Sequence, residues 1–505
     1  MRRLVRPSRL ASPALAALSL TTAALALTGM SGSGAQAAVT ARPATASKSP
    51  AQKWTKISAD TGLSIASAGL LRTSDGRLHV AWPSFDKNGT YSLHYSTVGG
   101  KAKLLDTGTI FKDWGGISAY PRLVATAGGG IRLVFAGGNN QGGSPFNLGA
   151  MYTATSSSAG TGWTLVNGSM SASEHVPLTD TSAATQTNGT PVAAWSATTA
   201  LDYHIGVDGN IPSKGPDLSL GVGADGDVTG PTLVRGSDGG IYAAWFNSSG
   251  TSSQGYWVAK LLPSPTAKVK APSSGGTGGG NNQPGRSVAF AARAGGGEYL
   301  AYCVLSKTRN CAHIDLWRDG TAKAVVVPGS GTGSAQYAAI ASGRDGHLWV
   351  LWYDEGLNKI RIVRTNAAAT RFGPVLTIAG PPKLGELDGL QAESSAGPLD
   401  VVALAQQSAN GSTPAYWDTQ VLPALTIRAS KSSVSNGKAA TITFTVTDTG
   451  SAVAGATVKF LGTSAKTNAK GVAKFTVKKG TARGSHVATA TRNGYAPARF
   501  TVKVT

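Results

Sequence analysis

Short apolar runs separated by turns recur seven times between residues 69 and 404. The first copy reads GLLRTSDGRLHVAW and a later one reads AAIASGRDGHLWVLW. Their turns carry Asp-Gly, Gly-Gly or Asn-Gly, which predicts two-residue hairpin loops because these residues tolerate positive φ. The second run of each copy is apolar at consecutive positions, which predicts a strand buried on both faces. The recurring aspartates of the turns are therefore interpreted as structural rather than catalytic: Asp75, Asp238 and Asp345.

The spacing of the copies predicts a β-propeller. The second run of each copy ends near a large side chain, and these side chains lie 50 to 60 residues apart: Trp82, Phe135, Trp195, Trp245, Tyr302, Trp352 and Leu404. An all-strand repeat of about that length is typical of propeller blades. The last copy has no fourth strand of its own, whereas KWTKISA lies unpaired before the first copy. We predict that residues 53–59 complete the last sheet and close a ring of seven blades, with six or eight as alternatives.

Residues 425–505 have a different pattern. KAATITFTVTD alternates apolar and polar residues, and GSAVAGATVKF and TNAKGVAKFTV read as further turns and strands. This tail resembles a bacterial immunoglobulin-like module, which implies a β-sandwich. It holds thirteen Lys and Arg against the single acid Asp448, so it carries +12 of the net charge of +21.

The predicted propeller, residues 51–424, resembles the sialidase-like secreted propellers in its Asp-Gly hairpins that end on aromatic residues. The Asp-box of that family, S-x-D-x-G-x-T-W, has no true counterpart, because SFDKNGTY at 84–91 has an extra residue and lies between the second and third strands. The resemblance implies an arginine cluster and a Tyr–Glu pair in an enzyme of this kind. Arg122 in YPRLV is the nearest string, but it begins a strand and is not assigned that role.

The first residues predict export. MRRLVRPSRL is basic, an apolar stretch follows, and small residues allow cleavage after Ala37. Residues 1–37 are therefore predicted to be a signal peptide and 38–50 a linker, with no membrane span after them. The two cysteines lie eight residues apart, and in an exported protein we expect a Cys303–Cys311 disulfide.

Motifs of familiar enzymes are missing. The sequence has no G-x-S-x-G, H-E-x-x-H or C-x-x-C, so neither a metal nor a cofactor is expected. In a propeller, the loops between second and third strands and those between blades surround one mouth of the channel. We expect polar residues of these loops to line it: Asp86, Lys87, Trp114, Tyr120, Asn139, Asn140, Asp202, Asp225, Asp227, Arg286, Lys307, Arg309, Asp354, Glu355, Glu386 and Asp388. The preferred ligand-binding residues are Trp114, Asp227, Arg286, Asp354 and Glu355, of which the three acids are also candidate catalytic groups.

These observations favour a secreted, non-catalytic propeller that binds a glycan or another extracellular ligand. The basic tail would attach it to an anionic cell wall, since its lysines alternate along strands without the aromatic residues of a nucleic-acid site. A diverged sialidase-like hydrolase or polysaccharide lyase is the first alternative. A protein-binding scaffold or adhesin is the second, and we expect a monomer.

Overall fold

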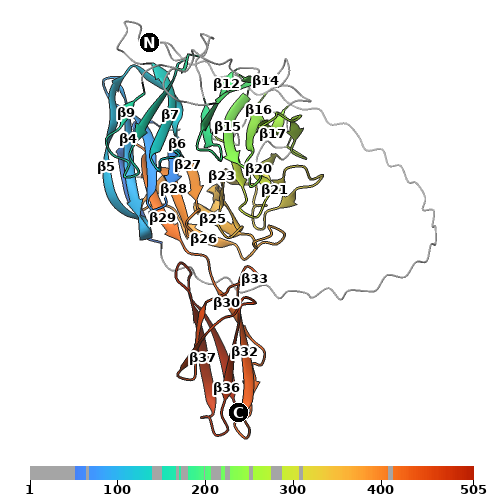
Figure 1. The fold of residues 1–505 in the computed structure, drawn as a ribbon. Coiled ribbons are helices and arrows are strands. Elements are labelled where there is room, and N and C mark those ends of the chain that lie inside the picture. The colour runs from blue at the N-terminus through green and yellow to red at the C-terminus, as the bar shows by residue number, and fades with distance from the viewer. Residues whose placement is uncertain are drawn as a thin grey trace, which may run out of the picture. The chain divides into compact units, whose positions relative to one another are not determined.

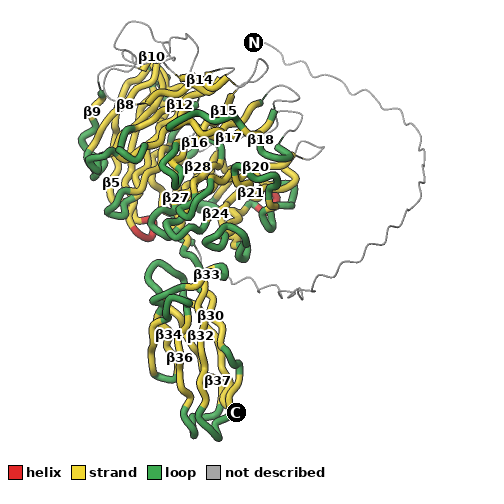
Figure 2. Tube along the Cα trace, turned by 45° about the vertical axis from the view of Figure 1, so that its right-hand side comes forward, coloured by secondary structure: helices red, strands yellow, loops and turns green. Residues whose placement is uncertain are grey.

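The computed structural model describes residues 52–63, 67–138, 150–166, 170–171, 180–197, 200–205, 218–221, 228–248, 254–274, 287–305, 311–407 and 413–505. Strands make up the regular structure of this part (Figure 2), apart from two short 3-10 turns, Gly100–Ala102 and Glu355–Leu357. In these residues no helix is long and apolar enough to cross a membrane. The predicted signal peptide and linker lie outside the described residues.

Seven small antiparallel sheets follow one another from residue 55 to residue 421. The first sheet holds β2 (Gly69–Arg72), β3 (Leu78–Phe85), β4 (Tyr91–Gly99) and β5 (Lys103–Trp114), and the second holds β6 (Gly116–Ala125), β7 (Ile131–Gly138), β8 (Ala150–Ser156), β9 (Thr164–Leu165) and β10 (Met170–Ser171). The third sheet holds β11 (Thr181–Thr185), β12 (Pro191–Ala197), β13 (Ala200–Ile205) and β14 (Leu218–Gly221). The fourth sheet holds β15 (Val228–Arg235), β16 (Ile241–Asn247), β17 (Gly255–Leu262) and β18 (Val269–Lys270). The fifth sheet holds β19 (Ala289–Ala292), β20 (Glu298–Leu305), β21 (Cys311–Arg318) and β22 (Val325–Val326). The sixth sheet holds β23 (Ala335–Ser342), β24 (Leu348–Asp354), β25 (Lys359–Arg364) and β26 (Leu376–Ala379). The seventh sheet holds β27 (Leu384–Glu393), β28 (Leu399–Gln407), β29 (Ala415–Val421) and β1 (Thr55–Asp60).

The first strands of the seven sheets form a closed cycle. Each contacts the first strand of the next sheet, in the order β2, β6, β11, β15, β19, β23, β27 and back to β2. Figure 1 shows the result, with β27 and β28 (orange) beside the first strands of the chain (blue). The side-chain amide of Gln391 seals this junction, because it both donates to the carbonyl of Ala68 and accepts from its N–H, each at 2.7 Å. This arrangement of sheets around an axis is a β-propeller.

The N-terminal strand completes the last sheet. β1 pairs antiparallel with β29, with Thr55 opposite Asp418. Ile57 of β1 is 1% exposed, and the Trp54 indole N–H just before the strand donates to the carbonyl of Ala379 at 3.0 Å. The predicted closure by residues 53–59 is confirmed, and it pairs an edge of β29 that would otherwise be open.

Burial explains the apolar second strands. All seven residues of β24, LWVLWYD, are buried, because neighbouring sheets pack on both of its faces. Its alternate residues belong to two separate cores, with Leu351 on one side and Trp352 on the other. A strand placed between two sheets has no wet face, so its sequence does not alternate.

The hairpin turns differ from the prediction in one respect. In all seven sheets a glycine with positive φ donates its N–H to the carbonyl three residues earlier, as Gly76 does to Thr73 at 2.9 Å. The aspartates before this glycine, such as Asp75, do not have positive φ. The turn is therefore a three-residue loop that ends in glycine, and the prediction of two-residue loops was wrong. The interpretation of the aspartates as turn residues is supported, since Asp75 accepts from the backbone N–H of Arg77.

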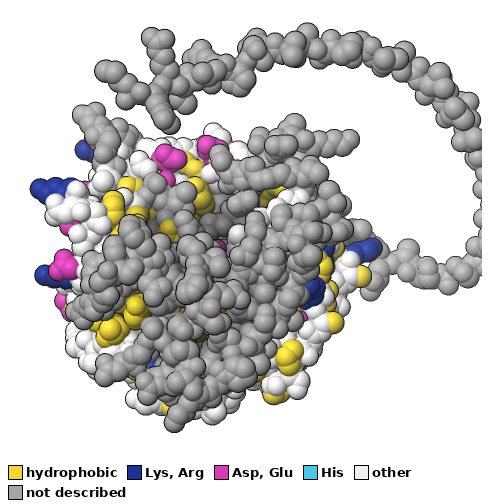
Figure 3. Space-filling model, turned by 90° about the horizontal axis from the view of Figure 1, so that it is seen from above, with side chains coloured by type: hydrophobic (Ala, Val, Ile, Leu, Met, Phe, Trp, Pro, Cys, Tyr) yellow, Lys and Arg dark blue, Asp and Glu magenta, His cyan; other side chains and the backbone are white. Residues whose placement is uncertain are grey.

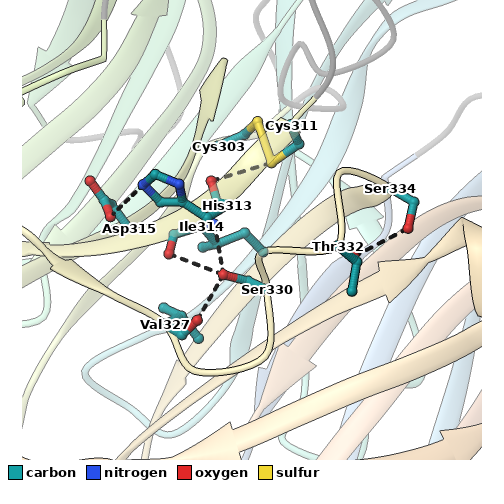
Figure 4. The surroundings of a disulfide bond; sticks show 9 residues. All are labelled: Cys303, Cys311, His313, Ile314, Asp315, Val327, Ser330, Thr332 and Ser334. Atoms are coloured by element: carbon teal, nitrogen blue, oxygen red, sulfur yellow. Dashed lines mark hydrogen bonds and ion pairs between the residues drawn. A yellow bond between two sulfur atoms is a disulfide. The ribbon is translucent and has the colours of Figure 1, made fainter. Parts of the chain in front are cut away.

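The predicted disulfide is confirmed. Cys303 near the end of β20 is joined to Cys311 at the start of β21, with the two Cα atoms 5.4 Å apart (Figure 4). Nearby, the Ser330 hydroxyl accepts from the N–H of Ile314 at 2.9 Å and donates to the carbonyl of Val327 at 2.7 Å. These bonds fix the connection after β22 against the middle of the sheet.

The tail from residue 426 contains two facing sheets. One holds β30 (Thr426–Ala429), β32 (Ala440–Asp448), β33 (Ser451–Ala452) and β36 (Val472–Val477); the other holds β31 (Ser433–Val434), β34 (Thr457–Phe460), β35 (Thr463–Lys466), β37 (Gly484–Thr491) and β38 (Ala498–Val504). Phe444, Phe460 and Phe475 meet edge to face between the sheets, 5.0 to 6.0 Å apart. The alternating sequence thus buries one face of each strand and exposes the other.

Candidate functional site

The first strands enclose a cavity of about 250 Å³ along the axis of the propeller. Small residues of these strands, such as Ala183, Ala289 and Gly389, face it and keep it open. Polar groups also reach it, so it is neither filled nor uniformly apolar. A concave, partly polar channel is where a ligand of a propeller is expected to bind.

One position of the repeat defines the mouth of this channel. It lies nine residues before the positive-φ glycine of each hairpin turn, and we call these seven residues the ring: Ser67, Tyr120, Asp180, Gly230, Ser287, Tyr337 and Asp388. Four ring residues fall within a register shift of β6, β15, β23 or β27, and the other three lie just before their strands. A bulge turns a side chain out of the regular pleat. Tyr337 accordingly has φ +50°, which is rare for a tyrosine. Four of the ring residues line the cavity: Ser67, Ser287, Tyr337 and Asp388.

Two ring positions carry aspartate, and the two are not equivalent. Asp180 Oδ2 accepts the N–H of Gly230, the ring residue of the next sheet, at 3.0 Å. Asp388 is only 6% exposed, yet its Oδ2 has no hydrogen-bond partner, and its Oδ1 is 3.5 Å from the amide of Gln406. Buried carboxylate oxygens are normally satisfied, so an unpaired one on a residue that lines a cavity calls for a ligand or a proton.

The surroundings of Asp388 change its acidity. Burial raises the pKa of this carboxyl from 3.8 to about 6, and the negative charge of Glu386 adds to the effect, while Gln406 opposes it. A carboxyl with such a pKa changes its protonation state near neutral pH, so it can accept or donate a proton there.

Next to Asp388, the sheet of β23 to β26 contributes a phenol and a carboxylate. Burial raises the pKa of Tyr337 to about 12, and the negative charges of Asp388, Glu386 and Glu355 contribute. Glu355 is exposed and accepts a hydrogen bond from the Gln336 amide at 2.6 Å. This part of the mouth, which we call the acidic side, therefore combines three carboxyl groups with one tyrosine.

The channel also carries one positive charge among its described lining residues. Arg122 of β6 lines the cavity and donates to the Ser67 hydroxyl and to the Thr181 carbonyl, both at 3.1 Å. Burial lowers the pKa of Arg122, while the negative charge of Asp180 favours its charged form. The sequence analysis gave Arg122 no role because it begins a strand, but that strand lines the channel.

The structure places the predicted ligand-binding residues in different environments, and two of them are not described. Asp227 and Arg286 lie outside the described residues. Trp114 is 4% exposed, with its ring packed edge-on against Phe135 at 5.0 Å and Tyr152 at 4.8 Å. It is a core residue with no free face for a sugar, so the structure argues against its predicted role.

The adjacent acids Asp354 and Glu355 are also separated by the structure. Asp354 is 1% exposed, accepts from the Ser334 hydroxyl at 2.8 Å and lies 3.3 Å from the Arg361 guanidinium. Its charge is already neutralised, which suits a structural role at the end of β24. Glu355 begins the following turn and stays a candidate at the mouth.

One cluster in the described part of the chain has the spacing of a metal site: Asp345, His347 and Asp448. The Arg364 guanidinium lies between the acids, 2.6 Å from Asp345 and 3.0 Å from Asp448. A guanidinium already supplies the positive charge that a cation would bring, so we interpret the cluster as a buried ion-pair network. It joins the sheet of β23 to β26 to the tail.

The sequence analysis placed Glu386 and Asp388 at the mouth but missed Tyr337, Gln336 and Gln406. Aligning the repeats on their turn glycines would have found Tyr337, because it occupies the same position as Asp388 and Tyr120. The two glutamines have no such signal, since their role depends on which neighbours the fold brings near.

Comparisons with known proteins give no family for this chain. No family model matches the sequence, and no curated protein does. Among solved structures, the chain is similar to the polysaccharide lyase Uly1 (9% identity, 70% of this chain and 89% of that one, TM-score 0.44). It is also similar to the β-propeller domain of the trilobed protease from Pyrococcus furiosus (10%, 70% and 95%, TM-score 0.38). A third is the α-L-arabinanase of Penicillium chrysogenum complexed with arabinobiose (13%, 73% and 97%, TM-score 0.38). At these identities and TM-scores no activity carries over, so function has to be argued from the site.

Proposed function

We propose that this protein is a secreted seven-bladed propeller that binds a glycan at the mouth of its channel, with an immunoglobulin-like tail that attaches it to an anionic polymer of the cell surface. The observation that carries the proposal is Asp388, a buried residue that lines the cavity and has one carboxylate oxygen without a hydrogen-bond partner. Around it are the groups that sugar sites use, namely a tyrosine ring, side-chain amides and further carboxylates.

The tail supports the second half of the proposal. Its thirteen Lys and Arg side chains are all exposed, and its single acid, Asp448, is buried and paired with Arg364. The outer surface of the sandwich therefore has only one sign of side-chain charge. Figure 3 shows that charges on the described surface of the propeller, seen from above, are instead scattered and of both signs. A surface of uniform charge attracts a polyanion over a distance of about 10 Å.

Glycoside hydrolysis is the second candidate. It is favoured by the raised pKa of Asp388, about 6, beside Glu386 and Tyr337. A hydrolase needs one carboxyl that stays protonated near working pH and a second that stays ionised. Asp388 has the first property, and the exposed Glu386 is the natural partner for the second.

A glycan array scored for both retention and released sugar tests the proposal. The protein should begin at Ala38 and be compared with two variants, Asp388→Asn and Asp106→Asn. Asp106 is an exposed acid on the outer strand β5, so its variant has the same change of charge away from the channel. Retention that is lost only in Asp388→Asn supports binding at the mouth. Release of sugar that is lost in the same variant favours the hydrolase, and no retention of any glycan contradicts the proposal.

A further inference from the structure

The acidic side of the mouth has more negative charge than the described groups around it can neutralise. Asp388 has an unpaired Oδ2 atom, Glu386 is exposed, and Glu355 receives a hydrogen bond from the neutral Gln336. Asp354, close by in sequence, differs because Arg361 lies 3.3 Å from it. Three carboxyl groups thus share one edge of the channel without a cation of their own.

Arg122 does not supply that cation. It is the positively charged residue among the described residues that line the cavity, and it belongs to β6 rather than to β23 or β27. Its guanidinium donates hydrogen bonds to Ser67 and Thr181, and the negative charge of Asp180 favours its charged form. The two ring aspartates therefore differ in their surroundings, because Asp180 interacts with the charge of Arg122 and Asp388 lines the cavity.

We infer that the group bound between Tyr337 and Asp388 is a protonated amine carried by a sugar, so that the ligand is a glycan of amino sugars. This inference rests on the proposed function and names the class of glycan. An ammonium donates three hydrogen bonds, and carboxylates with one aromatic ring are the groups that bind it best. Asp388 and Glu386 supply acceptors, while Tyr337 supplies the ring and a further oxygen.

The same charges work against acidic glycans. A uronate placed at this edge would lie near three carboxyl groups, and like charges brought together out of water repel strongly. An N-acetylated sugar can enter, but its amide has no charge to compensate Asp388. The channel therefore prefers a cationic ligand, whereas the basic tail prefers an anionic one. The glycan that the channel recognises is thus a different polymer from the one that anchors the protein.

Isothermal titration calorimetry at about pH 6.5 tests the inference with oligomers of equal length made of glucosamine, N-acetylglucosamine or galacturonate. A short lysine peptide serves as an amine without a sugar. We expect the glucosamine oligomer to bind at least about 10-fold more tightly than the others. Asp388→Asn should weaken this binding by about 10- to 100-fold, because a charge-assisted hydrogen bond is lost. Asp106→Asn should leave it unchanged.

The exposed residue Glu386 gives a second variant that does not depend on buried packing. Glu386→Gln should weaken glucosamine binding by about 2- to 5-fold. If the N-acetylated or acidic oligomer binds as well as the glucosamine oligomer, the inference is wrong but the proposed glycan site stands. If the lysine peptide binds as tightly as the glucosamine oligomer, the site recognises an amine and not a sugar, and the inference is wrong. If no oligomer binds, the inference and the proposed function fail together.

Discussion

Replacing Asp388 by Asn should make the protein more stable at neutral pH. The carboxyl is 6% exposed and lacks a partner for Oδ2, so its ionised form is poorly solvated in the folded state. Asparagine has nearly the same shape and no charge. A residue kept at the expense of stability is typical of a functional site, where selection acts on binding rather than on folding.

The size of the effect follows from the pKa. Folding raises it from 3.8 to about 6, a shift of about two units, and each unit corresponds to 1.36 kcal/mol. The protonated form is favoured by folding, so its contribution is complete below about pH 4 and is lost as the pH rises through about 6. Between these limits the free energy of unfolding should fall by about 3 kcal/mol through this group alone. Asp388→Asn lacks this loss, so above about pH 7 it should be the more stable protein by up to that amount.

Urea denaturation followed by tryptophan fluorescence, repeated across this pH range, measures the effect. The difference in unfolding free energy between the wild type and Asp388→Asn removes the titrations of all groups that do not interact with this carboxyl. The variant Asp106→Asn, with the same change of charge at an exposed site, is measured beside it as the matched control. A flat difference curve for Asp388→Asn, or one that favours the wild type at high pH, would refute the claim that its carboxylate is unpaired.

Three further predictions concern the frame of the propeller. Ile57→Ala should lower the unfolding free energy by about 2 to 4 kcal/mol in urea denaturation, because it leaves a cavity where β1 closes the ring; a loss below about 0.5 kcal/mol would mean that β1 is dispensable. Arg72→Met should lower the unfolding free energy by about 3 to 5 kcal/mol, and this loss should grow as the pH rises. Burial raises the pKa of both Asp400 and Asp418, and the variant removes the cation that they share. A loss of stability independent of pH would contradict this. Trp114→Ala should destabilise by about 3 to 5 kcal/mol yet leave glycan affinity unchanged in calorimetry; weaker binding by the folded variant would restore Trp114 to the site.

The fold could be predicted because its signals are local. Each blade contributes a turn glycine and an apolar second strand, and closure by residues 53–59 follows from counting strands. Trp114 shows where local reasoning stops. It looks like a loop aromatic at the end of a long strand, but Phe135 and Tyr152 of the next sheet cover it. That contact depends on packing between blades, which a strand pattern does not reveal.

The site depends on differences among equivalent positions rather than on a motif. All seven ring residues share one place in the repeat, but four lie in strand bulges and three precede their strands, and their side chains make one side of the mouth unlike another. The two aspartates of the ring, Asp180 and Asp388, show this difference most directly. Asp180 accepts a backbone N–H of the next sheet through Oδ2 and is not among the residues that line the cavity, whereas Asp388 lines it and has an oxygen without a hydrogen-bond partner. Asp180 precedes its strand, whereas Asp388 lies in the bulge of β27 and lines the cavity, so the bulge is what makes this carboxyl group available to a ligand.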